Sequence, residues 1–222
     1  MSPDPMASPG PRRVVVLRHG ETDHNAGGVW QGQLDSTLSE RGVRQAEAAG
    51  PAIAALNPTH LVSSDLTRAR STAEAVSRVI GLPVETDARF REIHVGAWQG
   101  LRTEEVRAGW AEVLDALGRG EDARRGDDGE TLAEVTARFG EALEEHLADI
   151  GPGECLVVAT HGAAGRAGVA WLLGLDQDVA WRVLAPLGNC HWAELVEGRE
   201  GWRLHTWNAS SGAESVPGTP PP

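Results

Sequence analysis

Two histidines occupy equivalent positions at the ends of two short apolar segments. Residues 14–17 lead into Arg18 and His19, and a glycine follows the histidine. Residues 156–159 lead in a similar way towards His161, which is also followed by a glycine. Neutral imidazole is a good nucleophile near pH 7, because its ordinary pKa is about 6.5. If the two segments are neighbouring parallel strands, both imidazoles face the crevice outside the carboxyl ends of the strands.

Two arginines indicate which kind of group would bind between these histidines. Arg18 stands directly before His19, and Arg68 lies in the first turn of a helix predicted over residues 67–80. The planar guanidinium group matches the geometry of phosphate oxygens, and the N-terminus of a helix favours anions. The sequence therefore predicts a pocket for a phosphate dianion with imidazole nitrogens inside it.

A phosphate pocket of this kind also needs an acid for the leaving alcohol. Glu92 is the best candidate, because it follows a strand predicted at residues 83–86 and precedes a turn at Gly96. One carboxyl group can protonate the leaving oxygen and later take a proton from water.

His94, two residues after Glu92, is predicted to border the substrate. The remaining histidines are interpreted as structural, and they are His24, His60, His146, His191 and His205.

The elements that must position these groups alternate between strand and helix. Buried strands are predicted at residues 14–17, 60–63 and 156–159, and amphipathic helices at residues 39–56, 67–80, 132–147 and 162–173. Two alternating segments near the C-terminus, residues 190–196 and 202–207, predict antiparallel edge strands. Together these elements predict an α/β fold, a three-layer α/β/α domain with a mainly parallel mixed sheet.

One domain is predicted over residues 12–209. Residues 1–11 and 210–222 are rich in proline, serine and glycine, and we expect a disordered leader and tail. Residues 101–130 are polar, charged and glycine-rich, with a short helical stretch at residues 106–117. This segment predicts an insertion outside the core, and its charged residues 121–130 are interpreted as a solvated loop, although the family resemblance given below implies a lid here.

Composition excludes several classes of partner. The net charge of −12 and the lack of a basic block argue against a nucleic-acid surface, and no apolar run approaches the ~20 residues that span a membrane. No cluster of acidic residues and histidines has the spacing of metal ligands, so no metal or cofactor is expected.

Cys155 and Cys190 form no disulfide or zinc pattern, and residues 1–11 lack the layout of a signal peptide. We expect reduced, buried thiols in a cytoplasmic protein.

Four motifs resemble those of the histidine phosphatase (phosphoglycerate mutase-like) superfamily, and they occur in the family order. They are LRHGETDHN at residues 17–25, SSDLTRA at 63–69, REIHVGAWQG at 91–100 and THG at 160–162. The resemblance extends over residues 13–208. It departs from the family pattern at residues 36–39 and at Ala163, without touching a charged residue of the predicted pocket.

The resemblance implies a role for each matching residue. His19 would be the nucleophile that becomes phosphohistidine, and Glu92 would be the acid and then the base. The phosphoryl oxygens would be held by Arg18, Arg68 and His161. The further substrate-binding candidates are Asn25, Gln31, His94 and Gly162. The family implies a metal-independent phosphoric monoester hydrolase that acts on a small phosphorylated substrate as a homodimer.

Further sequence features bear on the substrate. Mutases of this family grip phosphoglycerate with a tyrosine just after the acid glutamate and with a lysine, but this chain contains neither residue type. Residues 31–35, 96–101 and 202–210 resemble the branch that acts on phosphorylated glycosylglycerates, which predicts glucosyl-3-phosphoglycerate as the substrate. The alternatives left open are a cofactor-dependent phosphoglycerate mutase and a phosphatase of α-ribazole phosphate or sugar phosphates. A non-catalytic binding module is disfavoured, because no pocket residue is lost.

Overall fold

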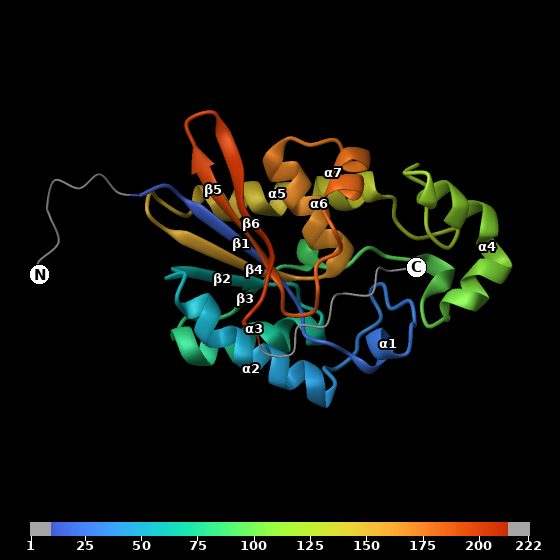
Figure 1. Ribbon diagram of the computed structural model, residues 1–222, viewed down its shortest axis with the longest axis horizontal. Coiled ribbons are helices and arrows are strands. Elements are labelled where there is room, and N and C mark those ends of the chain that lie inside the picture. Colours follow the sequence, from blue (N-terminus) through green and yellow to red (C-terminus); the bar gives the residue numbers. More distant parts are fainter. Residues whose placement is uncertain (1–9, 213–222) are drawn as a thin grey trace, which may run out of the picture.

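The computed structural model describes residues 10–212 (Figure 1). Most of the predicted leader and tail, residues 1–9 and 213–222, lies outside the described residues. No helix within the described part is both long and apolar enough to cross a membrane.

A six-stranded mixed sheet forms the centre of the molecule, with the strand order β3-β2-β4-β1-β5-β6. The first four strands in this order run parallel, while β5 and β6 run antiparallel to their neighbours. This arrangement confirms the predicted α/β fold with a mainly parallel mixed sheet. The strands are β1 (Arg13–Arg18), β2 (His60–Ser63), β3 (Glu85–Thr86), β4 (Cys155–Thr160), β5 (Trp192–Gly198) and β6 (Gly201–Ala209).

Helices cover both faces of this sheet. Ser39 caps the first long helix by accepting a hydrogen bond from the Gly42 N–H, and Gly81 ends the next helix in the left-handed conformation, with φ of 75°. Two short helices, α1 and α7, were not predicted from the sequence. The helices are α1 (Asp23–Ala26), α2 (Glu40–Ala54), α3 (Thr67–Ile80), α4 (Thr103–Gly118), α5 (Leu132–Ala148), α6 (Gly162–Leu173) and α7 (Gln177–Val183).

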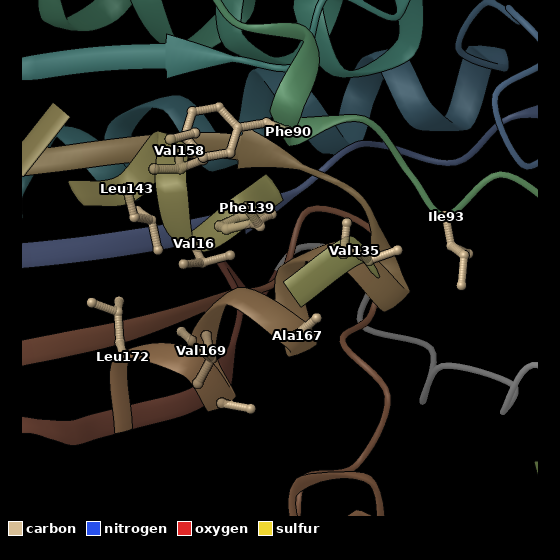
Figure 2. Close-up of a cluster of buried hydrophobic side chains, with 14 of the residues drawn as sticks. Val16, Phe90, Ile93, Val135, Phe139, Leu143, Val158, Ala167, Val169 and Leu172 are labelled. Atoms are coloured by element: carbon tan, nitrogen blue, oxygen red, sulfur yellow. The ribbon is translucent and has the colours of Figure 1, made fainter. Parts of the chain in front are cut away.

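The alternation of side chains along β1 decides which helices pack on which face. Val14 and Val16 belong to the cluster formed with α5 and α6, while Val15 and Leu17 belong to the cluster formed with α2 and α3. Figure 2 shows the first cluster, in which Val16 lies among side chains of α5 and α6. Because both faces are buried, the central parallel strands β1 and β4 are apolar between their terminal residues, which makes them recognisable in the sequence.

Two of the predicted strands begin later in the structure than the sequence pattern indicates. The strand predicted at residues 83–86 is limited to β3, whose two residues are exposed at the edge of the sheet. The strand predicted from residue 190 begins only at Trp192, because Cys190 adopts a positive φ of 54°. The Cys190 N–H donates to the carbonyl oxygens of Arg18 and His19, which ties this turn to the end of β1. Both cysteines are free and buried, as predicted.

The segment predicted as an insertion forms α4 and the loop of residues 119–131, at one end of the molecule (Figure 1). The loop contacts the turn after Glu92 through backbone atoms. The Ala97 N–H donates to the Gly126 carbonyl at 2.9 Å, and a Cβ on Gly126 would lie 2.2 Å from the Val95 carbonyl oxygen. Only glycine fits at this contact, which joins the insertion to the strand-end loops of the core.

Candidate active site

The two histidines selected from the sequence lie side by side at the carboxyl edge of the sheet. Strands β1 and β4 are parallel neighbours with Arg18 opposite Thr160, so the residues that follow them, His19 and His161, are adjacent. Their ring centroids are 5.1 Å apart, with the rings edge to face at 62°. Both side chains are buried. The condition on which the sequence argument depended, that the two strands be neighbours, is therefore met.

A backbone hydrogen bond orients the His19 ring. Its Nδ1 lies 2.6 Å from the carbonyl oxygen of Gly20, so Nδ1 carries the proton and donates. This leaves Nε2 with a free lone pair, which is the form that a nucleophile requires. In His161, Nε2 lies 2.9 Å from Ser64 Oγ, and the buried Nδ1 has no hydrogen-bond partner among residues 10–212.

The two predicted arginines are fixed by carbonyl groups rather than by carboxylates. Arg68 donates from Nη1 to the Leu34 carbonyl and from Nη2 to the Gly32 carbonyl, both at 2.7 Å. Arg18 donates from Nη1 to the Leu187 carbonyl. The Nε atoms of both arginines are buried without a partner in the described part of the chain. Burial lowers the pKa of Arg68 to about 10, which still leaves the side chain charged at neutral pH. Two buried cations with unused donors form a site prepared for an anion.

Burial and these cations keep both imidazoles neutral. Desolvation, followed by the positive charges of Arg68 and Arg18, lowers the pKa of His19 well below its ordinary value. The pKa of His161 is lowered in the same direction, mainly by burial and by Arg68. A neutral His19 at physiological pH has its lone pair available for attack on phosphorus.

These neutral histidines predict a pH-dependent stability. Below about pH 6.5 an unfolded histidine takes up a proton while its buried counterpart does not, so protons favour unfolding. We expect the free energy of unfolding to fall with decreasing pH, with about 1.4 kcal/mol per pH unit from each histidine until its folded pKa is reached. Urea denaturation in phosphate-free buffer between about pH 7.5 and 5 measures this slope.

The contribution of a single imidazole is isolated by substitution. His161→Gln should reduce the slope by about 1.4 kcal/mol per pH unit, because one of the two linked protons is removed. The exposed His205 on β6 provides the matched control, and His205→Gln should keep the wild-type slope. An unchanged slope in His161→Gln would show that His161 titrates normally in the folded protein.

Glu92 lies at the N-terminus of α6, close to the histidines. Its carboxylate accepts hydrogen bonds from the N–H groups of Ala164 at 2.9 Å and Ala163 at 3.2 Å. Gly162 separates it from Arg18, since a Cβ at this glycine would lie 3.5 Å from Arg18 Nε and 3.8 Å from Glu92 Oε2. The carboxylate is therefore placed next to the anion site, where the sequence argument requires an acid.

The loop that carries Glu92 is held from behind by Arg138 of α5. This guanidinium donates to the carbonyl oxygens of Arg89, Arg91 and Glu92 at 2.6 to 3.0 Å. It also forms an ion pair of 2.7 Å with Glu130. This network fixes the backbone on which the carboxyl group depends.

The remaining predicted substrate-binding residues differ in their placement. Asn25 and Gln31 line the same cavity as His19 and Glu92. Asn25 Oδ1 accepts from the Thr22 N–H, so its amide group remains a donor, while Gln31 Oε1 accepts from the Ser36 hydroxyl, and the one hydroxyl proton of Thr22 is within reach of either oxygen. His94, in contrast, is not part of the cavity lining, and its Nδ1 accepts a hydrogen bond from the Gly96 N–H instead. The expectation that His94 borders the substrate therefore lacks support, because the turn directs this ring to its own backbone.

The cavity above these groups has a volume of about 1000 Å³. Residues from α4, the following loop, α6 and α7 complete its wall, and they include two buried arginines that the sequence analysis missed, Arg125 and Arg166. Arg166 lies four residues after Gly162, a spacing that places both on one face of α6 and could have indicated it. No comparable signal marks Arg125, which reaches the cavity from an irregular loop.

Two neutral imidazoles, two arginines that pair with no carboxylate of the described residues, and an adjacent carboxyl group form a site suited to phosphoryl transfer through histidine. A sequence model of the histidine phosphatase superfamily (branch 1) matches residues 14–210. The chain belongs to this superfamily.

The relatives of this chain within the superfamily include proteins named as phosphatases and proteins named as mutases. Glucosyl-3-phosphoglycerate phosphatase of Mycolicibacterium vanbaalenii is 40% identical over 218 residues, covering 90% of this chain and 96% of the relative. A probable phosphoglycerate mutase, GpmB, of Erwinia tasmaniensis is 33% identical, covering 88% of this chain and 89% of the relative. The solved structure of mycobacterial glucosyl-3-phosphoglycerate phosphatase in complex with VO3 is similar with a TM-score of 0.83 and 38% identity, covering 90% of this chain and all of that one.

Proposed function

We propose that this protein is a phosphatase that hydrolyses glucosyl-3-phosphoglycerate through a phosphohistidine at His19. The observation that carries the proposal is the free Nε2 of a buried, neutral His19 beside two arginines whose buried Nε atoms have no partner among residues 10–212. The similarity to glucosyl-3-phosphoglycerate phosphatases over nine-tenths of the chain supports the choice of substrate.

In the first step, His19 Nε2 attacks phosphorus and the bond from phosphorus to the substrate oxygen breaks. The protonated carboxyl group of Glu92 gives its proton to that oxygen, so that a neutral alcohol leaves. Arg18 and Arg68 supply hydrogen bonds and positive charge to the phosphoryl oxygens, with His161 and Asn25 as further donors. These groups provide charge stabilisation without a metal ion.

In the second step, water attacks the phosphohistidine and the bond between nitrogen and phosphorus breaks. The Glu92 carboxylate accepts a proton from the water, which regenerates the acid and releases inorganic phosphate. His19 returns to its neutral form, with its Nδ1 proton still bonded to the Gly20 carbonyl. One carboxyl group thus serves both half-reactions.

The shape of the cavity favours a substrate larger than a phosphoglycerate. Its volume of about 1000 Å³ extends well beyond the phosphate pocket, and apolar side chains such as Trp30, Leu114 and Trp181 line it together with polar ones. A sugar presents both polar edges and apolar faces, which suits such a wall. The absence of tyrosine and lysine from the chain removes the residue types with which the related mutases hold phosphoglycerate.

A comparison of substrates tests this proposal. We expect kcat/KM for glucosyl-3-phosphoglycerate to exceed that for 3-phosphoglycerate and for α-ribazole phosphate by about 100-fold, which corresponds to roughly 2.7 kcal/mol of transition-state binding. Interconversion of 2- and 3-phosphoglycerate should stay negligible with a bisphosphoglycerate primer. Efficient interconversion would instead identify a mutase, and a preference for α-ribazole phosphate would overturn the substrate alone.

We also propose that residues 101–130 act as a lid over the substrate and that the protein works as a cytoplasmic homodimer. Support for the lid comes from Thr103, Arg107 and Leu114 of α4, which line the cavity. The two free thiols fit a reducing compartment. The homodimer rests on the family resemblance.

A further inference from the structure

Arg166 of α6 is a buried cation that the proposed chemistry does not use. Its side chain is 4% exposed, and no carboxylate of residues 10–212 forms an ion pair with it. Its guanidinium carbon lies 3.1 Å from the centre of the Trp181 ring, and Nη1 donates to the Leu184 carbonyl at 3.1 Å. Its Nε is buried and has no partner in the described structure. Burial lowers the pKa of Arg166 to about 10, so the group remains charged at neutral pH.

An isolated buried charge is unfavourable unless a partner compensates it. The indole ring and one carbonyl group offset part of the cost, but donors remain unused at a position that lines the cavity. Arg166 follows Gly162 by four residues, about 6 Å along the helix axis. Since Gly162 lies against Arg18 and Glu92, Arg166 stands about one helical turn beyond the phosphate pocket.

Arg125 reaches the same cavity from the loop after α4. It is 7% exposed, and its Nη1 donates to Asp122 at 3.1 Å and to the Ala123 carbonyl at 2.9 Å. Asp122 is shared, because its carboxylate also accepts the N–H groups of Leu132 and Ala133 at the start of α5. The other guanidinium nitrogens of Arg125 make no hydrogen bond within the described residues.

The buried charges of the cavity wall are positive, since Arg68, Arg125 and Arg166 are buried whereas the six acidic residues that line the cavity lie partly or fully in solvent. The Glu92 carboxylate acts electrostatically on four buried arginines, namely Arg18, Arg68, Arg125 and Arg166. When Glu92 is protonated to act as the acid, that shared negative charge is lost. Arg18 and Arg68 match one phosphate dianion, which leaves Arg166 without an anionic partner and Arg125 with only the shared carboxylate of Asp122 among the described residues. The cavity is therefore suited to a ligand with a second anionic group.

We infer that Arg166 and Arg125 form a second anion subsite that binds the carboxylate of the substrate. The assignment of this anion as a carboxylate rests on the proposed function. In glucosyl-3-phosphoglycerate, the carboxylate carbon lies two carbons away from the phosphorylated carbon. Binding at this subsite places the phosphoryl group in front of His19 and selects phosphorylated acids over phosphorylated alcohols. Arg166 and Arg125 are thus specificity-determining residues.

A matched pair of inhibitors tests the subsite without the sugar. 3-Phosphoglycerate and glycerol 3-phosphate differ in having a carboxylate or a hydroxymethyl group, and each competes with p-nitrophenyl phosphate. We expect the wild-type enzyme to bind 3-phosphoglycerate about 10- to 100-fold more tightly, the range expected for hydrogen bonds to a charged group. The ratio of the two inhibition constants does not depend on the fraction of enzyme that is folded.

Arg166→Gln should reduce this ratio by about 10-fold or more, and Arg125→Gln should reduce it in the same direction. The matched control is Arg182→Gln, because Arg182 follows Trp181 on α7 but is exposed and pairs with Asp178. This control should keep the wild-type ratio. Equal reductions in Arg182→Gln and Arg166→Gln would indicate a general charge effect and overturn the inference.

The outcomes separate the subsite from the proposed substrate. A wild-type ratio near one, or an unchanged ratio in Arg166→Gln, overturns the subsite even if glucosyl-3-phosphoglycerate is hydrolysed well. A reduced ratio in Arg166→Gln together with poor hydrolysis of glucosyl-3-phosphoglycerate supports the subsite and contradicts the proposed substrate.

Discussion

Replacement of His19 by alanine is expected to abolish the phosphoenzyme and to lower kcat by at least about 10⁴-fold. The free Nε2 of His19 is the only nucleophile that the proposed mechanism provides. His161 does not replace it, because its Nε2 is engaged with Ser64 Oγ at 2.9 Å and its Nδ1 is the atom left to donate to the phosphoryl oxygens in that mechanism. Rapid quenching with a substrate labelled in its phosphoryl group should trap an acid-labile, alkali-stable phosphoprotein in the wild type and none in His19→Ala.

A histidine away from the cavity provides the control for this experiment. His205 is exposed on β6, and His205→Ala should label and turn over like the wild type. Circular dichroism and the urea midpoint establish that His19→Ala is folded. Labelling of the folded His19→Ala protein at the wild-type level would assign the nucleophile to another residue.

Replacement of Glu92 by glutamine should affect substrates according to their leaving groups. We expect a loss of about 10²- to 10³-fold in kcat/KM on alkyl phosphates, whose leaving oxygen needs a proton. On p-nitrophenyl phosphate the loss should stay within about 10-fold, because nitrophenolate leaves without protonation. The divergence between the two substrates reports on proton donation, whereas a misplaced loop would affect both.

Glu121→Gln is the matched control for charge. Glu121 also lines the cavity, but it is exposed and pairs with Arg119 at 2.6 Å. The same change of charge at this position should alter both substrates by less than about 3-fold. Equal losses on alkyl and aryl phosphates in Glu92→Gln would remove Glu92 from the role of the acid.

The sequence alone determined the elements whose patterns are local. Residues 14–17, 61–62 and 156–159 of the runs that became β1, β2 and β4 are buried, and all of them are apolar. Helices α2 and α5 were recognisable from their apolar spacing, and Gly81 marked the end of α3 at its left-handed position. The main candidates for the chemistry stand at the ends of such segments, where strand and helix signals locate them without knowledge of the fold.

The tertiary structure decided which of these ends meet and what else meets them. The pairing of β1 with β4 brings His19 to His161, and it depends on strand order, which no local pattern encodes. The short α7 depends on its packing against α6. The His94 ring faces its own backbone, because Gly96 forms a turn beside it.

Arg125 and Arg166 illustrate the limit most clearly. In the sequence they are two of 20 arginines, and most of the others lie partly or fully in solvent. Their burial results from contacts between segments that are distant in the chain, such as α6 with Trp181 of α7 and the loop after α4 with the start of α5. Burial, and for Arg166 also the absence of a carboxylate partner among residues 10–212, turns an ordinary arginine into a candidate binding residue. Both properties depend on long-range packing, and only the folded chain displays them.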